Sequence, residues 1–177
     1  MSEAINSMFS WYRDASVCYA ILSDVDYHGN DDSGYEDAFR RSRWFTRGWT
    51  LQELLAPRTT LFFSRQWYPL GSNLTLAPRI ADITGIPRDI LIHVKPLNEV
   101  NASGRISWAA RRQTTRTEDE AYSLIGSLGV KMSISYGEGR AAFFRLQEEA
   151  AKQLYDSSIF VWGPTPLPNA CVRDPPC

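Results

Sequence analysis

A continuous apolar run, residues 17–22 (VCYAIL), constrains the fold more than any other stretch of the chain. It has the length of a strand, and a run without polar alternation is typical of a strand buried on both faces, as in a parallel sheet. An amphipathic helix is expected just before it, over residues 2–14, and a second strand over residues 59–67. Strands that alternate with helices predict an α/β fold with a parallel sheet.

Helical periodicity and capping signals predict most of the remaining elements. Helices are expected over residues 35–43, 76–83, 103–112, 121–128 and 143–154, with a last short strand over 159–162. The proline-rich end of the chain has the composition of a disordered tail.

Composition favours a single globular domain and argues against a nucleic-acid-binding or membrane-spanning protein. The chain has 177 residues, of which 44% are hydrophobic, and a net charge of −1. That length suits one domain with a real core, and the charge gives no field that would attract nucleic acid. No apolar stretch reaches the ~18 residues of a membrane span. Cys18, Cys171 and Cys177 form neither a disulfide framework nor a metal site by their spacing, so we expect a cytoplasmic protein.

A second informative stretch, residues 47–57 (RGWTLQELLAP), predicts a short helix. Thr46 is placed to cap its first turn through the hydroxyl group. Pro57 ends it, because a proline disfavours helical backbone in the residue before it. Trp49 and Glu53 are four residues apart and share one face, whereas the leucines point toward a core.

The carboxylate beside an indole supports two interpretations. A glutamate on a short helix is most often a solvated surface residue, and spacing alone favours that interpretation. As a functional group, a carboxylate stabilises the oxocarbenium-like transition state of glycosidic cleavage. Cleavage of the nicotinamide–ribose bond of NAD is the same chemistry, and an indole stacks well on nicotinamide. Glu53 is therefore the candidate catalytic residue, and Trp49 a candidate substrate-binding residue.

Polar residues follow the first predicted strand. Ligands of open α/β sheets bind beyond the carboxyl ends of the strands, which makes Ser23 and Asp24 candidate substrate-binding residues. A polar loop after a strand is the commoner explanation for either one alone. His28 and His93 are too far apart for a metal site, and no metal is expected.

Two further stretches admit both an anion-binding and a structural interpretation. The basic run 111–116 (RRQTTR) follows a predicted helix, where cations complement the helix dipole as readily as they bind phosphate. Residues 137–140 (GEGR) open a helix, whose free N–H groups suit an anion. The glycines suit a tight turn equally well.

Residues 47–57 resemble the signature of the fungal heterokaryon-incompatibility (HET) domain family. Other stretches resemble the family in the same order along the chain, and together they span nearly residues 1–163. These stretches are residues 8–15, 18–25, 107–112, 114–119, 121–126, 136–139 and 144–149.

The resemblance has implications for chemistry. HET domains are similar to TIR domains, which have a flavodoxin-like α/β fold and some of which cleave NAD with a Glu in a W-x-x-x-E-L helix. Trp49 and Glu53 match that spacing, which implies that Glu53 is catalytic and that NAD is a substrate rather than a bound cofactor. Position 50 is Thr where TIR domains often have Cys, which departs from the pattern without affecting the Glu.

The resemblance also implies an organisation. Residues 1–57 correspond to the C-terminal part of a HET domain, 58–163 to the extension that follows it, and 164–177 to the disordered tail. Blocks resembling S-Y-x-W-G and W-I-D-x-x-C-I-N/D, which open full HET domains, are not found in the chain. We therefore expect an incomplete TIR-like parallel sheet flanked by helices, with a mostly helical C-terminal extension.

Three functional hypotheses follow from the resemblance. The first is an effector of programmed cell death triggered by non-self in vegetative incompatibility, acting by NAD cleavage. The second is a non-enzymatic module that assembles with copies of itself or with other incompatibility proteins. The third is an inactive truncated remnant. None of them requires a cofactor, nucleic acid or a membrane span.

Overall fold

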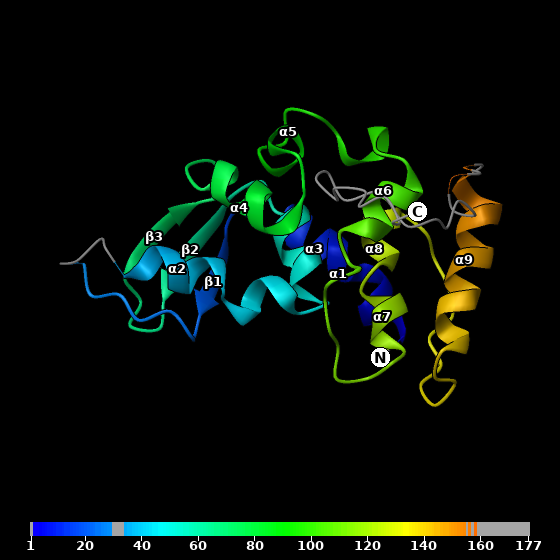
Figure 1. Ribbon diagram of the computed structural model, residues 1–177. Coiled ribbons are helices and arrows are strands. Elements are labelled where there is room, and N and C mark those ends of the chain that lie inside the picture. Colours follow the sequence, from blue (N-terminus) through cyan, green and yellow to red (C-terminus); the bar gives the residue numbers. More distant parts are fainter. Residues whose placement is uncertain (1, 30–33, 155, 157, 159–177) are drawn as a thin grey trace, which may run out of the picture.

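The computed structural model describes residues 2–29, 34–154, 156 and 158 (Figure 1). The strand predicted over 159–162 and the predicted tail lie outside the described residues. The elements are α1 Ser2–Asp14, β1 Cys18–Leu22, α2 Tyr35–Arg40, the 3-10 helix η1 Arg43–Thr46, α3 Thr50–Leu55, β2 Thr60–Ser64, β3 Pro69–Ser72, α4 Ala77–Thr84, α5 Arg88–Leu91, the 3-10 helix η2 Leu97–Glu99, α6 Ala102–Ser107, α7 Asp119–Tyr122, α8 Ile125–Leu128 and α9 Ala141–Leu154.

The strands form one mixed sheet in the order β1-β2-β3. β1 and β2 are parallel and separated by helices, which confirms the α/β class, whereas β3 is antiparallel to β2. The predicted parallel pairing holds for β1 and β2, whereas β3, which the sequence did not predict, makes the sheet mixed. A turn of only four residues joins β2 to β3, and so short a connection permits only an antiparallel pair. Trp67 within that turn has a positive φ of 64°.

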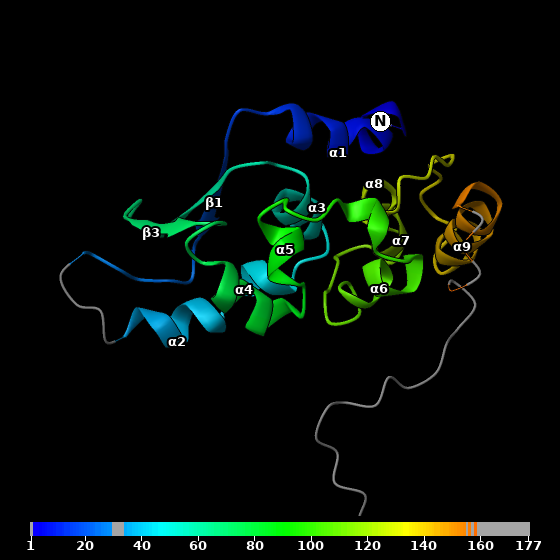
Figure 2. The ribbon, with the colours of Figure 1, turned by 90° about the horizontal axis from the view of Figure 1, so that it is seen from above.

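The two faces of the sheet differ. Ala20, Leu22 and Phe62 are at most 1% exposed and lie in the core, and α2 and α4 lie on one side of the sheet (Figures 1 and 2). On the other face of β1, Tyr19 is 56% exposed and Ile21 is 37% exposed. The expectation that this strand is buried on both faces was wrong, because the described helices cover only one of them.

Helix α3 lies between the sheet and the C-terminal helices (Figures 1 and 2). It contacts α1, α5 and α8. Leu51 and Leu54 are fully buried and Leu55 nearly so, as its leucine pattern predicted. Burial of a leucine side chain contributes roughly 1.5–3 kcal/mol. A helix of six residues is too short to be stable alone, so α3 is stabilised mainly by these tertiary contacts.

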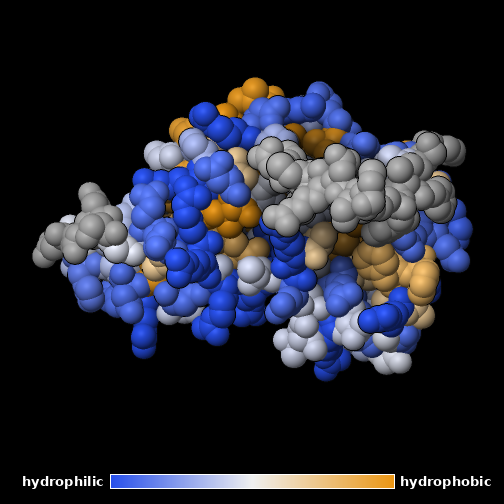
Figure 3. Space-filling view, viewed as in Figure 1, coloured by the Kyte–Doolittle hydropathy of each residue, from blue (hydrophilic) through white to orange (hydrophobic). Residues whose placement is uncertain are grey.

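The N-terminal helix is also part of this arrangement, because α1 contacts α8 as well as α3. Gly126 in α8 allows the close approach: a Cβ atom there would lie 2.2 Å from Cβ of Phe9. The outward surface of α2, which faces away from the sheet, is largely hydrophilic (Figure 3).

The C-terminal helices partly match the prediction. α4, with Gly85 at its end in the left-handed region (φ 72°), and α9 lie where the sequence placed them. The helix predicted over 121–128 is two short helices, α7 and α8, and the one predicted over 103–112 ends at Ser107. In the second case the chain leaves the helix to run beside the segment before α3, where Arg47 and Gln113 form an isolated parallel bridge. None of the helices in the described ranges is long and apolar enough to cross a membrane.

Candidate functional site

Helix α3 begins and ends for reasons that the sequence predicted only in part. Thr46 does not cap it: its hydroxyl donates to the carbonyl of Arg43 in η1, over 3.0 Å. Thr50, the first residue of α3, donates instead to the carbonyls of Trp44 and Arg47. The helix ends at Leu55 with its C-cap just before the proline, as predicted.

Glu53 lies on α3 at the meeting point of three other elements. The Tyr12 hydroxyl, from the last turns of α1, and the Trp44 indole, from η1, hydrogen-bond to its carboxylate. The Cys18 thiol, at the start of β1, is close enough to respond to its charge. The side chain is largely buried, which excludes the solvated surface residue that spacing alone favoured.

Opposing effects set the ionisation of Glu53. Burial raises the pKa of its carboxyl group above the ordinary value, because a low-dielectric environment disfavours the charged form. Hydrogen bonds from Tyr12 and Trp44 and the charges of Arg47 and Arg112 lower that pKa. The effect of burial is the larger, so Glu53 keeps its proton to a higher pH than an exposed glutamate does.

The neighbours of Glu53 respond in the same direction. Burial, followed by the charge of Glu53, raises the pKa of Tyr12 to about 12 and the pKa of Cys18 to about 11. Both groups are therefore protonated at neutral pH. Cys18 is a thiol rather than a thiolate, which makes it a poor nucleophile despite its place beside the carboxylate.

Arg112, from the basic run 111–116, is the buried cation of this cluster. Arg112 is largely buried, and burial lowers its pKa to about 10, against the opposing effect of Glu53. It remains charged at neutral pH. Its Nη1 donates to the carbonyl of Arg47 and to the Thr50 hydroxyl, both over 2.9 Å. Its neighbour Arg111 is exposed, so the run has two different faces.

The indole hydrogen-bonded to Glu53 belongs to Trp44 and not to Trp49, the residue that the spacing had singled out. Trp49 is half-buried and packs against the core. Sequence reasoning missed Tyr12, Trp44 and Arg112 as companions of the carboxylate. They come from three separate segments, and Tyr12 and Arg112 are far from Glu53 in the sequence.

Asp24 and Ser23 lie at the carboxyl end of β1, as predicted. Asp24 accepts hydrogen bonds from the Ser42 hydroxyl and the Arg43 backbone N–H, both over 2.7 Å. Burial acts against these bonds, but together with the charge of Arg43 they hold the pKa of Asp24 below its usual value. Asp24 thus anchors the start of η1, while Ser23 is exposed. A substrate-binding role for either residue stays a prediction.

The other candidate stretches have structural partners. The N–H groups of Gly137 and Gly139 donate to the Glu118 carboxylate over 2.7 and 3.1 Å, so the anion that they hold belongs to the chain itself. His93 Nε2 contacts the carbonyl of Pro57 at 2.7 Å. Among the residues that the structure describes, no group of three or more His, Cys, Asp or Glu side chains is placed to hold a metal ion.

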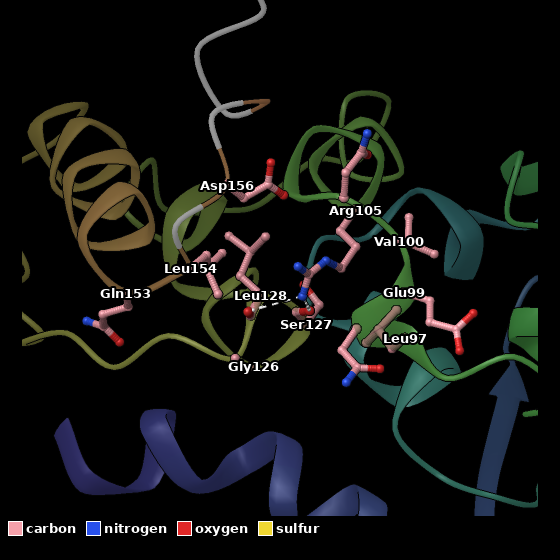
Figure 4. Close-up of a pocket in the computed structure, with 13 residues that line it drawn as sticks. Leu97, Glu99, Val100, Arg105, Gly126, Ser127, Leu128, Gln153, Leu154 and Asp156 are labelled. Atoms are coloured by element: carbon pink, nitrogen blue, oxygen red, sulfur yellow. Dashed lines mark hydrogen bonds between the residues drawn. The ribbon is translucent and has the colours of Figure 1, made fainter.

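A pocket of about 590 Å³ lies between η2, α6, α8 and the end of α9 (Figure 4). Arg105 extends into it, and its Nη1 donates to the carbonyls of Ser127 and Leu128 over 3.0 and 3.1 Å. Neither Glu53 nor the other predicted site residues are among the residues that line it. The pocket and the Glu53 cluster are therefore separate features.

Comparison with known proteins gives one informative relative. The sequence is 46% identical, over 156 residues, to the vegetative incompatibility protein HET-E-1 of Podospora anserina. The chain is homologous to a segment of HET-E-1. The match covers 86% of this chain but 11% of HET-E-1, so the chain spans about a tenth of that protein's length. No family model matches the chain, and no solved structure matches it significantly.

Proposed function

We propose that the chain is a HET-type, TIR-like effector module of fungal vegetative incompatibility that cleaves NAD, with Glu53 as the catalytic residue. The homology to HET-E-1 supports the incompatibility context. The observation that carries the chemistry is the largely buried Glu53 carboxylate, hydrogen-bonded by Tyr12 and Trp44, on a helix with the W-x-x-x-E-L spacing.

In NAD hydrolysis the Glu53 carboxylate would stabilise the positive charge of the transition state. The bond between C1′ of the ribose and the nicotinamide nitrogen breaks, and its electron pair leaves with nicotinamide. Positive charge then develops on the ribose, which an ionised Glu53 stabilises. A water oxygen bonds to C1′ and loses a proton, giving ADP-ribose, nicotinamide and one proton. Because only the ionised form serves, the rate should rise with pH as Glu53 loses its proton.

A cell experiment tests the proposal. Induced expression in a fungal host should arrest growth and lower the cellular NAD level, and Glu53→Gln should abolish both effects at equal protein level. The Glu120→Gln variant serves as the matched control and should keep both effects, since it makes the same substitution at an exposed glutamate in α7. Growth arrest with an unchanged NAD level would reject the enzymatic function.

The sheet favours a second candidate, a self-assembling interaction module. Its outer face includes Tyr19, Ile21 and Phe63, and Trp67, in the turn after β2, lies against Phe63. Tyr19 and Phe63 have ring centroids 5.6 Å apart, and Phe63 and Trp67 are 6.0 Å apart. Tyr19 and Trp67 are 56% and 61% exposed. Contiguous exposed aromatic side chains of this kind mark association surfaces, and a second copy of the chain presents the same face.

Oligomeric state against concentration tests this candidate. Light scattering after size exclusion should show a dimer or larger species, and Tyr19→Lys should reduce it to the monomer. Phe144→Lys is the control, because Phe144 is 67% exposed but lies on α9, away from the sheet. A monomer at every concentration, or equal effects of the two lysines, would reject assembly through the outer face.

A further inference from the structure

The segment that follows α6 is bonded to the segment that leads into α3. The Gly48 N–H donates to the carbonyl of Gln113 over 2.9 Å, and the Gln113 N–H donates to the carbonyl of Thr46 over 2.6 Å. Residues 46–48 and residue 113 thus run side by side although more than sixty residues separate them. The first turn of α3 is fixed from outside the helix as well as from within.

Arg112 adds side-chain bonds to this backbone pairing. Its Nη1 donates to the carbonyl of Arg47 and to the Thr50 hydroxyl over 2.9 Å each, and its Nε donates to the carbonyl of Trp108 over 3.3 Å. Its Nη2 is buried without a hydrogen-bond partner. The guanidinium group is therefore held in one place, and its charge has little contact with water.

We propose that Arg112 is a positioning residue of the Glu53 site, which fixes the first turn of α3 and supplies a buried positive charge that favours the ionised carboxylate. The consequence for catalysis rests on the proposed function of Glu53. The positioning itself is a property of the folded chain and is testable without substrate.

Four titratable groups face Glu53 from the elements around it. They are Tyr12 from α1, Cys18 from β1, and the two arginines, Arg47 before α3 and Arg112 after α6. Tyr12 and Cys18 are neutral at pH 7, because their pKa values are raised to about 12 and about 11. The positive charge near Glu53 at neutral pH therefore comes from the two arginines.

The two arginines act differently. Both lower the pKa of Glu53, and Arg47 lowers it more than Arg112 does. Arg47 is exposed, so salt and water screen its charge, whereas a largely buried and hydrogen-bonded Arg112 is screened much less. At high ionic strength, Arg112 is left as the main cation that favours ionised Glu53.

A titration of Glu53 tests the proposal. The Glu53 side-chain carboxyl carbon is followed by NMR in the full chain labelled at glutamate, with Glu53→Gln to assign the signal and 0.5 M salt to screen Arg47. The midpoint should rise in Arg112→Gln and stay near the wild-type value in Arg112→Lys, which keeps the charge. Arg111→Gln is the matched control, since it removes an exposed arginine one residue away, and should leave the midpoint unchanged.

An unchanged midpoint in folded Arg112→Gln would overturn the proposal, and so would an equal rise in Arg112→Lys. If Arg112→Gln fails to fold, Arg112→Lys decides: its unfolding free energy should fall, because lysine cannot make all of the guanidinium's bonds, while its Glu53 midpoint stays. A midpoint that moves in that variant contradicts the role. Expected midpoints without nicotinamide release would reject the reaction and leave the positioning role standing.

Discussion

Substitution of Gly48 tests how the Glu53 site is assembled from distant parts of the chain. A Cβ atom at this position would lie 2.4 Å from Cγ2 of Thr114, whereas carbon atoms pack at about 3.5–4.0 Å. Gly48 cannot easily recede, because its N–H is bonded to the carbonyl of Gln113. We therefore expect Gly48→Ala to push residues 113–114 away from the entry to α3.

The size of the effect follows from overpacking. Forcing an extra carbon into a close-packed site costs about 1–3 kcal/mol. For a chain of this length, 1 kcal/mol corresponds to about 2–4 °C in melting temperature. Gly48→Ala should then lower the melting temperature by roughly 2–12 °C, measured by circular dichroism, with a matching loss in urea unfolding.

Thr114→Ser provides the internal control. It removes the Cγ2 atom that the new methyl group would strike, and it keeps the hydroxyl that donates to the carbonyl of Arg116 over 2.6 Å. Alone it should change stability by less than about 0.5 kcal/mol. Combined with Gly48→Ala it should restore most of the loss, a coupling that a double-mutant cycle measures. A Gly48→Ala chain as stable as wild type, or no rescue by Thr114→Ser, would refute this assembly of the site.

Three other perturbations have clear expected outcomes. Glu53→Gln should lower the pKa of Cys18, now about 11, because it removes the carboxylate charge, so iodoacetamide should alkylate Cys18 at lower pH. Leu54→Ala should cost about 2–5 kcal/mol of unfolding free energy in urea, since the side chain is fully buried. Hydrogen bonds from its own backbone N–H and from the 137–139 turn hold the pKa of Glu118 below 4.5. Its contribution to stability is lost as pH falls through that lowered pKa, so Glu118→Gln should flatten the fall in melting temperature below about pH 4.5.

Each of these has a control. Alkylation is measured in a Cys171→Ser, Cys177→Ser background, and an unchanged Cys18 profile would separate the thiol from Glu53. Leu74→Ala, at a side chain 65% exposed, should cost less than about 0.5 kcal/mol. Glu120→Gln is the control for Glu118→Gln, because Glu120 is an exposed glutamate in α7, the helix that Glu118 precedes. It should leave the fall in melting temperature below about pH 4.5 as in wild type.

Periodicity was sufficient for the elements that bury a regular pattern. The apolar stripe of α1, the runs of β1 and β2, and the long helix α9 all form close to the predicted residues. β3 was missed because Pro69 and Gly71 are rare in strands, and its pairing depends on a tight turn rather than on its own sequence. Only one face of β1 is buried, because burial of a strand depends on which helices pack against it. An apolar run in the sequence does not specify that packing.

The site was predictable only where its residues are neighbours in sequence. The spacing of Trp49 and Glu53 identified the helix and its carboxylate. Tyr12, Trp44 and Arg112 come from three separate segments, so no local pattern joins them to Glu53. The basic run was interpreted as a helix end or a phosphate-binding stretch. In the structure Arg112 is largely buried and Arg111 is exposed, a difference that the sequence did not indicate.

The central claim, that Glu53 makes this fold an NAD-cleaving module, is tested most directly by nicotinamide release from purified chain. Folded protein incubated with NAD should release nicotinamide and ADP-ribose in equal amounts, quantified by chromatography. The rate should rise with pH through the Glu53 midpoint and be abolished by Glu53→Gln, whose fold is confirmed by circular dichroism. Release by Glu53→Gln at the wild-type rate, or none from folded wild-type chain at high concentration, would contradict the account.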